Sequence, residues 1–166
     1  MVDMGGRGMV TGRVHGRQSF FVIYRIVPMS TNTSAAVTQL PTDQELVLKV
    51  IPMPADCNAN GDIFGGWVMA QVDLAGSVVP ARYTKGRMAT VAVKEFVFKQ
   101  PVRVGDILSF FSKVDRIGRT SITVKVEVYA ERYFSQGQYA KVTEATVTYV
   151  AIDEAGQPRE IAKNLP

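Results

Sequence analysis

The residue with the clearest potential for chemistry is a single carboxylate inside an apolar segment. Residues 63–81 are almost wholly apolar or small, and Asp73 is the one ionisable side chain among them. Burial of an unpaired carboxylate costs several kcal/mol, and alanine would suit a helix better at this position. Two interpretations stay open: Asp73 is a reacting carboxylate, or it is a structural group that binds a backbone amide or an arginine.

A glycine pair, Gly65-Gly66, stands near the start of the same segment. The first amides of a helix have no partner within the helix and carry a partial positive charge. Glycine leaves these amides uncovered, so that a developing oxyanion could approach them. Tight packing or a special backbone angle explains the pair equally well.

The spacing between these residues indicates that one chain cannot form such a site alone. Gly65 and Asp73 are eight positions apart, which is about 12 Å along a helix axis. A reacting carbonyl must lie about 3 Å from both the donor and the base. Two antiparallel helices from two subunits meet this requirement, because two-fold symmetry brings the start of one toward the middle of the other. If Asp73 reacts, we therefore expect the active site at a dimer interface.

The elements that must position these residues follow a simple order. A strand over 45–53 precedes a cluster of turn-forming residues, and the apolar segment then predicts a buried helix over 66–81 that ends near Pro80. Strands joined by tight turns follow over 88–98, 107–116, 122–129 and 139–152. Short turns imply antiparallel neighbours, so the sequence predicts an α+β domain with one helix on an antiparallel sheet.

Length, charge and cysteine content limit the class of protein. The 166 residues suffice for one domain with a sizeable core. Residues 1–29 carry a net charge of +3 against +4 for the whole chain, so the basic balance lies in the leader and no nucleic-acid function is expected. No apolar run is long enough for a membrane span, so no membrane association is expected either. Cys57 is the single cysteine, which favours a reducing compartment, and we expect a cytoplasmic protein.

The chain divides into a leader and one domain. Residues 1–43 are expected to be flexible, and the domain is expected over 44–162. Residues 1–28 are glycine-rich, then basic, then briefly apolar. We interpret them as sequence upstream of the true start at Met29, with a disordered tail as the alternative.

Several stretches of the domain resemble one family. The segment MPADCNANGDIFGGW at 53–67, followed by QVDLAG at 71–76, strongly resembles the bacterial acyl-CoA thioesterases of the YciA type, which have the hot-dog fold. The stretches TVAV at 90–93, PVRVGD at 101–106 and VEV at 126–128 carry the same resemblance. The match extends over residues 45–160 and leaves the leader without a counterpart.

The resemblance implies a fold, an assembly and an activity. The implied hot-dog fold is a five-stranded antiparallel sheet wrapped around one long buried helix. The implied assembly is a homodimer, commonly built into a trimer of dimers, that is, a homohexamer. The implied activity is hydrolysis of acyl-CoA to a free fatty acid and coenzyme A. The alternative is a hot-dog module that binds an acyl group or coenzyme A without cleaving it.

The resemblance also implies catalytic residues. The family's reacting carboxylate falls on Asp73, as general base for water or as direct nucleophile. The amide that polarises the thioester carbonyl falls on Gly65 and is given to the site by the other subunit, with Gly66 as a second donor. Asp62 stands where eukaryotic relatives commonly have an asparagine, so we expect it either to position water or to cap the helix.

The remaining candidates concern substrate binding. Asn58 and Asn60 are possible substitutes for that asparagine, and Thr90 lies in the matching TVAV stretch. For the phosphates of coenzyme A we expect polar groups at strand ends, namely Arg87, Lys99, Arg119, Thr120 and Ser121. No metal or cofactor is expected, coenzyme A being part of the substrate, because the sequence has no Cys/His cluster and no glycine-rich phosphate loop. The chain's one histidine, His15, lies in the leader.

Overall fold

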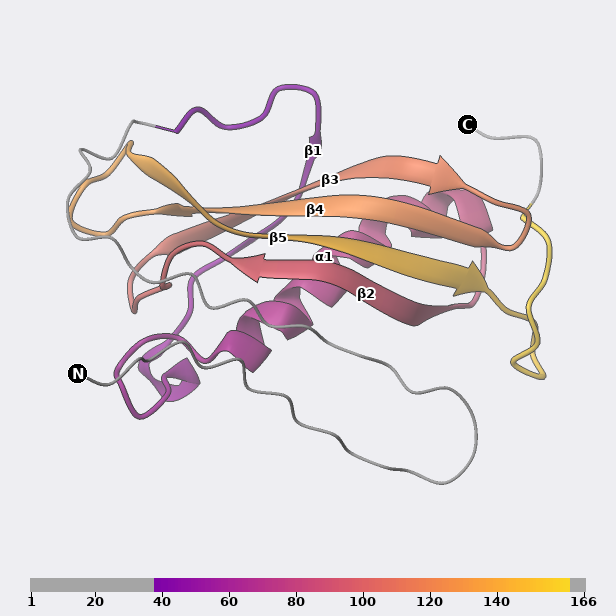
Figure 1. Cartoon of the computed structure of the whole chain (residues 1–166), viewed down its shortest axis with the longest axis horizontal. Helices are drawn as coiled ribbons and strands as arrows, with labels where there is room; N and C mark the ends of the chain where they lie inside the picture. Colours follow the sequence, from indigo (N-terminus) through magenta and orange to yellow (C-terminus); the bar gives the residue numbers. More distant parts are fainter. Residues whose placement is uncertain (1–37, 162–166) are drawn as a thin grey trace, which may run out of the picture.

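The computed structural model describes residues 38–161. In chain order, the elements are β1 (Glu45–Val50), the 3₁₀ helix η1 (Pro54–Asp56), α1 (Gly65–Thr84), β2 (Met88–Phe98), β3 (Ile107–Ile117), β4 (Ser121–Glu131) and β5 (Tyr139–Ala151). Figure 1 shows α1 running along one face of the curved sheet. The leader up to residue 37, and with it the predicted start at Met29, lies outside the described residues, as does residue 162.

The sheet has five strands in the order β1-β3-β4-β5-β2, and every neighbouring pair is antiparallel. Along β4, Ile122, Val124, Val126 and Val128 are completely buried beneath α1, whereas Lys125 between them is exposed. A strand with one apolar face packs that face against another element. The predicted α+β architecture, with one helix on an antiparallel sheet, is therefore the observed one.

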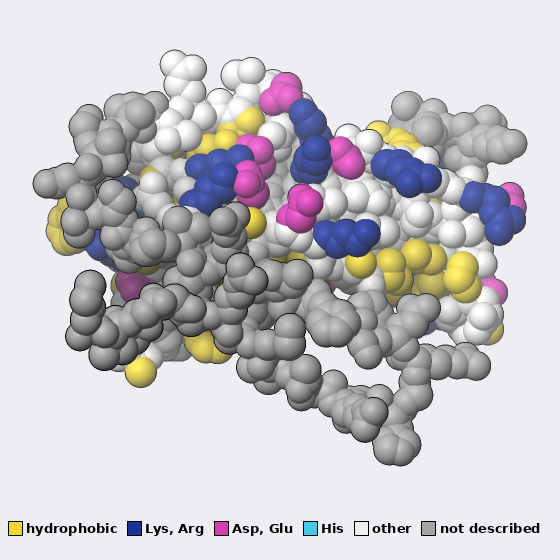
Figure 2. All heavy atoms as spheres, in the orientation of Figure 1, with side chains coloured by type: hydrophobic (Ala, Val, Ile, Leu, Met, Phe, Trp, Pro, Cys, Tyr) yellow, Lys and Arg dark blue, Asp and Glu magenta, His cyan; other side chains and the backbone are white. Residues whose placement is uncertain are grey.

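The outward face of the sheet is polar. Figure 2 shows lysine and arginine side chains interspersed with aspartate and glutamate over this face. Two of the pairs are Lys113 with Asp43 and Lys125 with Asp115, at 2.8 and 3.1 Å. Such exposed pairs contribute little to stability. The helix side of the sheet therefore holds the main core, and the outward side carries these charged pairs together with the buried Tyr129.

Helix α1 is longer and less buried than the sequence predicts. It begins at Gly65 and continues past Pro80 to Thr84, because Pro80 and Thr84 are themselves buried and tertiary packing overrides the helix-breaking tendency of proline. The Nη2 group of Arg159 donates a hydrogen bond of 2.6 Å to the terminal carbonyl of Thr84. Strand β1 also differs from the prediction, because it ends at Val50 rather than at residue 53. Pro52 explains this end, since proline has no N–H group to donate to a neighbouring strand.

One stripe of α1 faces away from the sheet. Gly66, Ala70 and Leu74 follow each other at helical spacing and are exposed in the single chain. Leu74 has 60% of its surface exposed. The prediction of a helix buried on most sides is therefore met on the sheet side only. Among residues 38–161 no helix is long and apolar enough to cross a membrane.

Candidate functional site

Asp73 lies halfway along α1 and is half-buried. Its Oδ1 atom accepts a hydrogen bond of 2.7 Å from Oγ1 of Thr90, which comes from β2. The hydroxyl of Tyr149, from β5, lies 3.4 Å from the same oxygen and 2.7 Å from the backbone carbonyl oxygen of Asp73. No lysine or arginine of the described residues forms an ion pair with Asp73. Hydroxyl groups, rather than the arginine or backbone amide of the structural interpretation, therefore hold this carboxylate.

Tyr149 is a site residue that the sequence reasoning missed. Only 1% of its surface is exposed. Burial raises the pKa of Tyr149 far above its ordinary value, and the negative charge and hydrogen bond of Asp73 raise it further. The hydroxyl therefore stays protonated and acts as a donor. The sequence held a signal for Tyr149, because it continues the inward-facing, apolar positions of β5 that alternate with threonines. A buried tyrosine hydroxyl needs a hydrogen-bond partner.

The start of α1 presents two free amides. Phe64 is the N-cap residue, and no side chain caps the helix. The carbonyl of Phe64 accepts from the amides of Trp67 and Val68, at 3.0 and 3.3 Å. The amides of Gly65 and Gly66 donate to no acceptor within the described part of the chain. Within residues 38–161 these two N–H groups therefore have no acceptor, and their role toward a thioester carbonyl stays a prediction.

The packing around the glycine pair also limits larger side chains. A Cβ atom on Gly66 would lie 2.6 Å from Cε1 of Phe64, and one on Gly65 would lie 3.2 Å from Cζ of Phe98. The tight-packing interpretation of the pair therefore holds together with the free amides, and the two do not exclude each other.

The loop before the helix has a structural role at Asn58. Its side-chain Oδ1 atom accepts a hydrogen bond from the backbone amide of Asn60 at 2.8 Å. Its backbone amide donates to the carbonyl of Asp62 at 2.8 Å. This is the Asx-turn geometry that asparagine favours. The prediction that Asp62 caps the helix is wrong, because the N-cap is Phe64. Roles for Asp62, Asn58 and Asn60 toward water or substrate stay predictions.

The polar residues predicted for phosphate binding fall into two groups. Backbone hydrogen bonds from residues 151–161 reach the carbonyls of Arg87, Arg119 and Thr120, so these residues and the adjoining Ser121 meet at one end of the sheet. Lys99 follows the opposite end of β2 and pairs with Glu144 at 2.7 Å. The structure thus brings four of the five candidates together within one chain.

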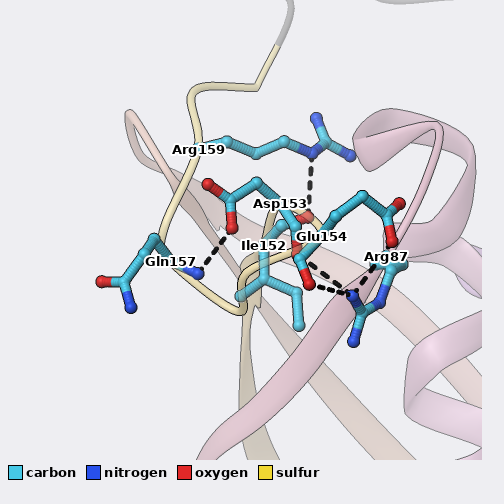
Figure 3. Close-up of polar contacts among 6 residues, drawn as sticks. All are labelled: Arg87, Ile152, Asp153, Glu154, Gln157 and Arg159. Carbon is cyan, nitrogen blue, oxygen red and sulfur yellow. Dashed lines mark hydrogen bonds and ion pairs between the residues drawn. The ribbon is translucent and has the colours of Figure 1, made fainter.

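Arg87 is tied to the turn that follows β5 (Figure 3). Its Nη1 group lies 3.3 Å from the carbonyl of Asp153, and 3.0 and 3.3 Å from the carbonyl and Oε2 atoms of Glu154. Glu154 is almost fully exposed, with 95% of its side chain accessible. An exposed pair of this kind is weak, so a phosphate could compete for the guanidinium of Arg87.

Neither the one pocket described for this structure nor any metal-binding cluster adds to the site at Asp73 within residues 38–161. A shallow pocket of about 230 Å³ is lined by backbone and side chains of Glu95, Lys125, Glu127, Glu144 and Thr146 and their neighbours, on the outward face of the sheet. It does not include Asp73. Within residues 38–161 no three histidine, cysteine, aspartate or glutamate side chains could together hold a metal ion.

Comparison with known proteins places this geometry in context. Residues 60–132 match the thioesterase superfamily. The chain is 43% identical over 119 residues to the acyl-CoA thioester hydrolase YciA of Escherichia coli K12, covering 70% of this chain and 90% of that protein. Among solved structures it is similar to a hexameric thioesterase from Yersinia pestis, with 43% identity, 75% and 100% coverage and a TM-score of 0.71.

A second solved structure supports the fold. The hexameric hotdog fold thioesterase of Campylobacter jejuni is 42% identical and superimposes with a TM-score of 0.68, over 72% of this chain and 91% of that one. The predicted hot-dog fold is therefore confirmed. By these matches in sequence and structure, the chain belongs to the YciA family of acyl-CoA thioester hydrolases, within the thioesterase superfamily.

Proposed function

We propose that this protein hydrolyses acyl-CoA thioesters and that Asp73 is the reacting carboxylate. The observation that carries the proposal is the state of Asp73, which is half-buried, held at one oxygen by Thr90 and unpaired with any cation of residues 38–161. Such a carboxylate is costly to the fold and available to a substrate. The names of the relatives supply the substrate class, since they are acyl-CoA thioester hydrolases.

We further propose that the site is completed by a second copy of the chain. Strand β2 is at one edge of the sheet and exposes Val91 and Val93. The exposed stripe of α1, which includes Leu74, adjoins it through the contact of Asp73 with Thr90. An apolar edge strand of 11 residues needs a partner, and an antiparallel copy of β2 would extend the sheet and cover the stripe.

The register of that pairing supports the same arrangement. Gly65 packs against Phe98 at the end of β2, whereas Asp73 contacts Thr90 near its beginning. A two-fold axis at Val93, the middle of β2, places the end of one copy beside the beginning of the other. The amide of Gly65 of the partner subunit then approaches Asp73, which one chain alone cannot achieve across about 12 Å of helix.

The proposed chemistry is acyl transfer to water. The amides of Gly65 and Gly66 stabilise the oxyanion that forms when the thioester carbonyl is attacked. In one route Asp73 takes a proton from water, the hydroxide adds to the carbonyl carbon, and the C–S bond breaks to release coenzyme A as thiolate. In the other route Asp73 itself adds, forming an anhydride that water then hydrolyses. Both routes give one carboxylic acid and one free thiol.

The two routes are distinguishable by isotope labelling. A single turnover in heavy-oxygen water, followed by mass analysis of the peptide that contains Asp73, reports on the nucleophile. Label in the carboxylate is expected only if an anhydride has formed, because water then attacks one of its two carbonyls. An unlabelled peptide shows that water attacked the acyl carbonyl, either of the thioester in the general-base route or of the anhydride.

Further parts of the proposal concern binding, assembly and location. Arg87, Arg119, Thr120 and Ser121 bind the phosphates of coenzyme A, and Lys99 of the partner subunit joins them, because antiparallel pairing of β2 brings it to that end. Three dimers form a hexamer, and the thioesterases named above from Yersinia pestis and Campylobacter jejuni are hexameric. The reaction uses no metal or prosthetic group, and the single cysteine fits a cytoplasmic location.

The test of the proposed function is thiol release from a panel of acyl-CoA esters by the Asp73→Asn variant. Loss of a catalytic base is expected to lower kcat by about a hundredfold or more, with fold and assembly unchanged. The matched control is Asp115→Asn on the outward face, which should keep wild-type activity. If the wild-type protein binds acyl-CoA but releases no thiol from any ester, the non-catalytic binding module is the correct interpretation.

A further inference from the structure

Tyr149 reaches α1 through a gap that a glycine provides. A Cβ atom on Gly76 would lie 2.6 Å from the hydroxyl oxygen of Tyr149 and 3.2 Å from Cγ2 of Val126. Gly76 lies inside the helix and is not among the residues with positive φ, so the backbone does not require glycine here. Glycine is less favourable than alanine in a helix interior. The close approach of the tyrosine hydroxyl explains why it is present.

The hydroxyl has one proton and two acceptors from the same residue. It lies 2.7 Å from the carbonyl oxygen of Asp73 and 3.4 Å from Oδ1. Tyr149 is also the cross-strand partner of Thr90, whose hydroxyl donates to Oδ1. Neighbouring positions of β5 and β2 thus place two donors beside one carboxylate oxygen.

The arrangement leaves the second oxygen free. Oδ2 of Asp73 has no hydrogen-bond partner among the residues of the described range. With Oδ1 held and the backbone carbonyl fixed, the side chain has one preferred direction. A fixed reacting group loses less freedom when the substrate binds.

We propose that Tyr149 is a positioning residue for catalysis. Its hydroxyl occupies the space beside Gly76 and fixes the turn of α1 at Asp73, so that Oδ2 of Asp73 points at the thioester. The inference rests on the proposed function, because it assigns a task to Tyr149 only if Asp73 reacts. Its raised pKa fits this role, since burial keeps the hydroxyl protonated and unable to act as a base.

The first test is the kcat and KM of Tyr149→Phe. This variant keeps the ring in the core and removes the hydroxyl. We expect kcat to fall by about tenfold, with KM within about twofold of wild type, because the substrate does not touch the buried ring. The matched control is Tyr129→Phe. Tyr129 is also buried and donates to the carboxylate of Glu127 at 2.6 Å, but on the outward face, so kcat should not change.

The second test is a double-mutant cycle with Gly76→Ala. Alone, Gly76→Ala displaces the hydroxyl and is expected to lower kcat as much as Tyr149→Phe does. In the Tyr149→Phe background the obstructing oxygen is gone and the nearest atom is Cγ2 of Val126 at 3.2 Å, so Gly76→Ala should have a much smaller further effect on kcat. Multiplication of the two effects to about a hundredfold contradicts the inference, as does wild-type kcat in Tyr149→Phe.

The outcomes separate this inference from the proposed function. If Asp73→Asn is inactive while Tyr149→Phe and Gly76→Ala have wild-type kcat, the inference fails and the proposed function stands. If Asp73→Asn is as active as wild type, Asp73 is not the reacting carboxylate and this inference fails with that assignment, whereas the hydrolase activity itself stands. Should Tyr149→Phe not fold, as judged by circular dichroism, Gly76→Ala is the second variant, because its Cβ atom would displace the hydroxyl while the tyrosine is kept; its fold is checked in the same way, and wild-type kcat in a folded Gly76→Ala contradicts the inference.

Discussion

Subunit complementation tests whether the two halves of the site come from different chains. The perturbation is Gly65→Pro, which removes the amide proposed as the oxyanion donor. Proline is tolerated at the first position of a helix, and Phe64 before it has φ −60° and ψ 127°, which a following proline accepts. The matched control is Gly65→Ala, which adds the same Cβ atom, 3.2 Å from Phe98, but keeps the N–H group.

The magnitude follows from the symmetry of the dimer. We expect Gly65→Pro to lose about a hundredfold or more in kcat, as for removal of one oxyanion donor, and Gly65→Ala to lose much less. Asp73→Asn is inactive for a different reason. In a refolded equal mixture of the two inactive variants, a site that takes Asp73 from one chain and Gly65 from the other is intact in about one case in four. The mixture should therefore recover about 25% of wild-type thiol release.

The assay compares the mixture with each variant refolded alone. Recovery to about one quarter supports a shared site, since neither parent can contribute it. If the mixture is no more active than its parents, although mass spectrometry shows mixed dimers, each site is built within one chain and the reasoning from helix geometry is refuted. Control mixtures of Gly65→Ala with Asp73→Asn show whether subunit exchange itself reduces activity.

Two further predictions concern stability. Arg132→Met should lower the free energy of unfolding by about 3 kcal/mol or more in urea denaturation, because Asp106, whose side chain is 3% exposed, loses its 2.6 Å partner; an unchanged unfolding midpoint would contradict this. Burial alone would raise the pKa values of Glu127 and Glu144. Hydrogen bonds and charge from Lys141, joined by the hydroxyl of Tyr129 for Glu127 and by Lys99 for Glu144, outweigh burial and lower both pKa values below the ordinary 4.5. Because their pKa values are lower in the folded protein, the two ionised carboxylates stabilise the fold above about pH 4.5, and this stabilisation is lost as the pH falls through the lowered pKa values. The difference in free energy of unfolding between wild type and Lys141→Met should therefore be largest at about pH 7 and shrink below about pH 4.

Local pattern was enough to predict most of the fold. The alternation along β4 and the short turns around it fix the antiparallel arrangement, because side-chain direction repeats every two residues in a strand. Asp73 was identifiable for the same local reason, as one charge in an apolar run. The end of α1 was not, since Pro80 predicts a stop and only the buried environment of Pro80 and Thr84 shows why the helix continues.

The sequence by itself therefore determined the order of elements, the antiparallel sheet and the carboxylate with most potential for chemistry. The tertiary structure alone decided what holds that carboxylate. Thr90 and Tyr149 are 17 and 76 positions away from Asp73 in the chain, and Gly76 leaves space for a hydroxyl that comes from another strand. Periodicity reports which face a residue occupies, because it depends on neighbouring dihedral angles. Which residues meet across the core depends on strand register and helix packing, and these are fixed only when the whole chain has folded.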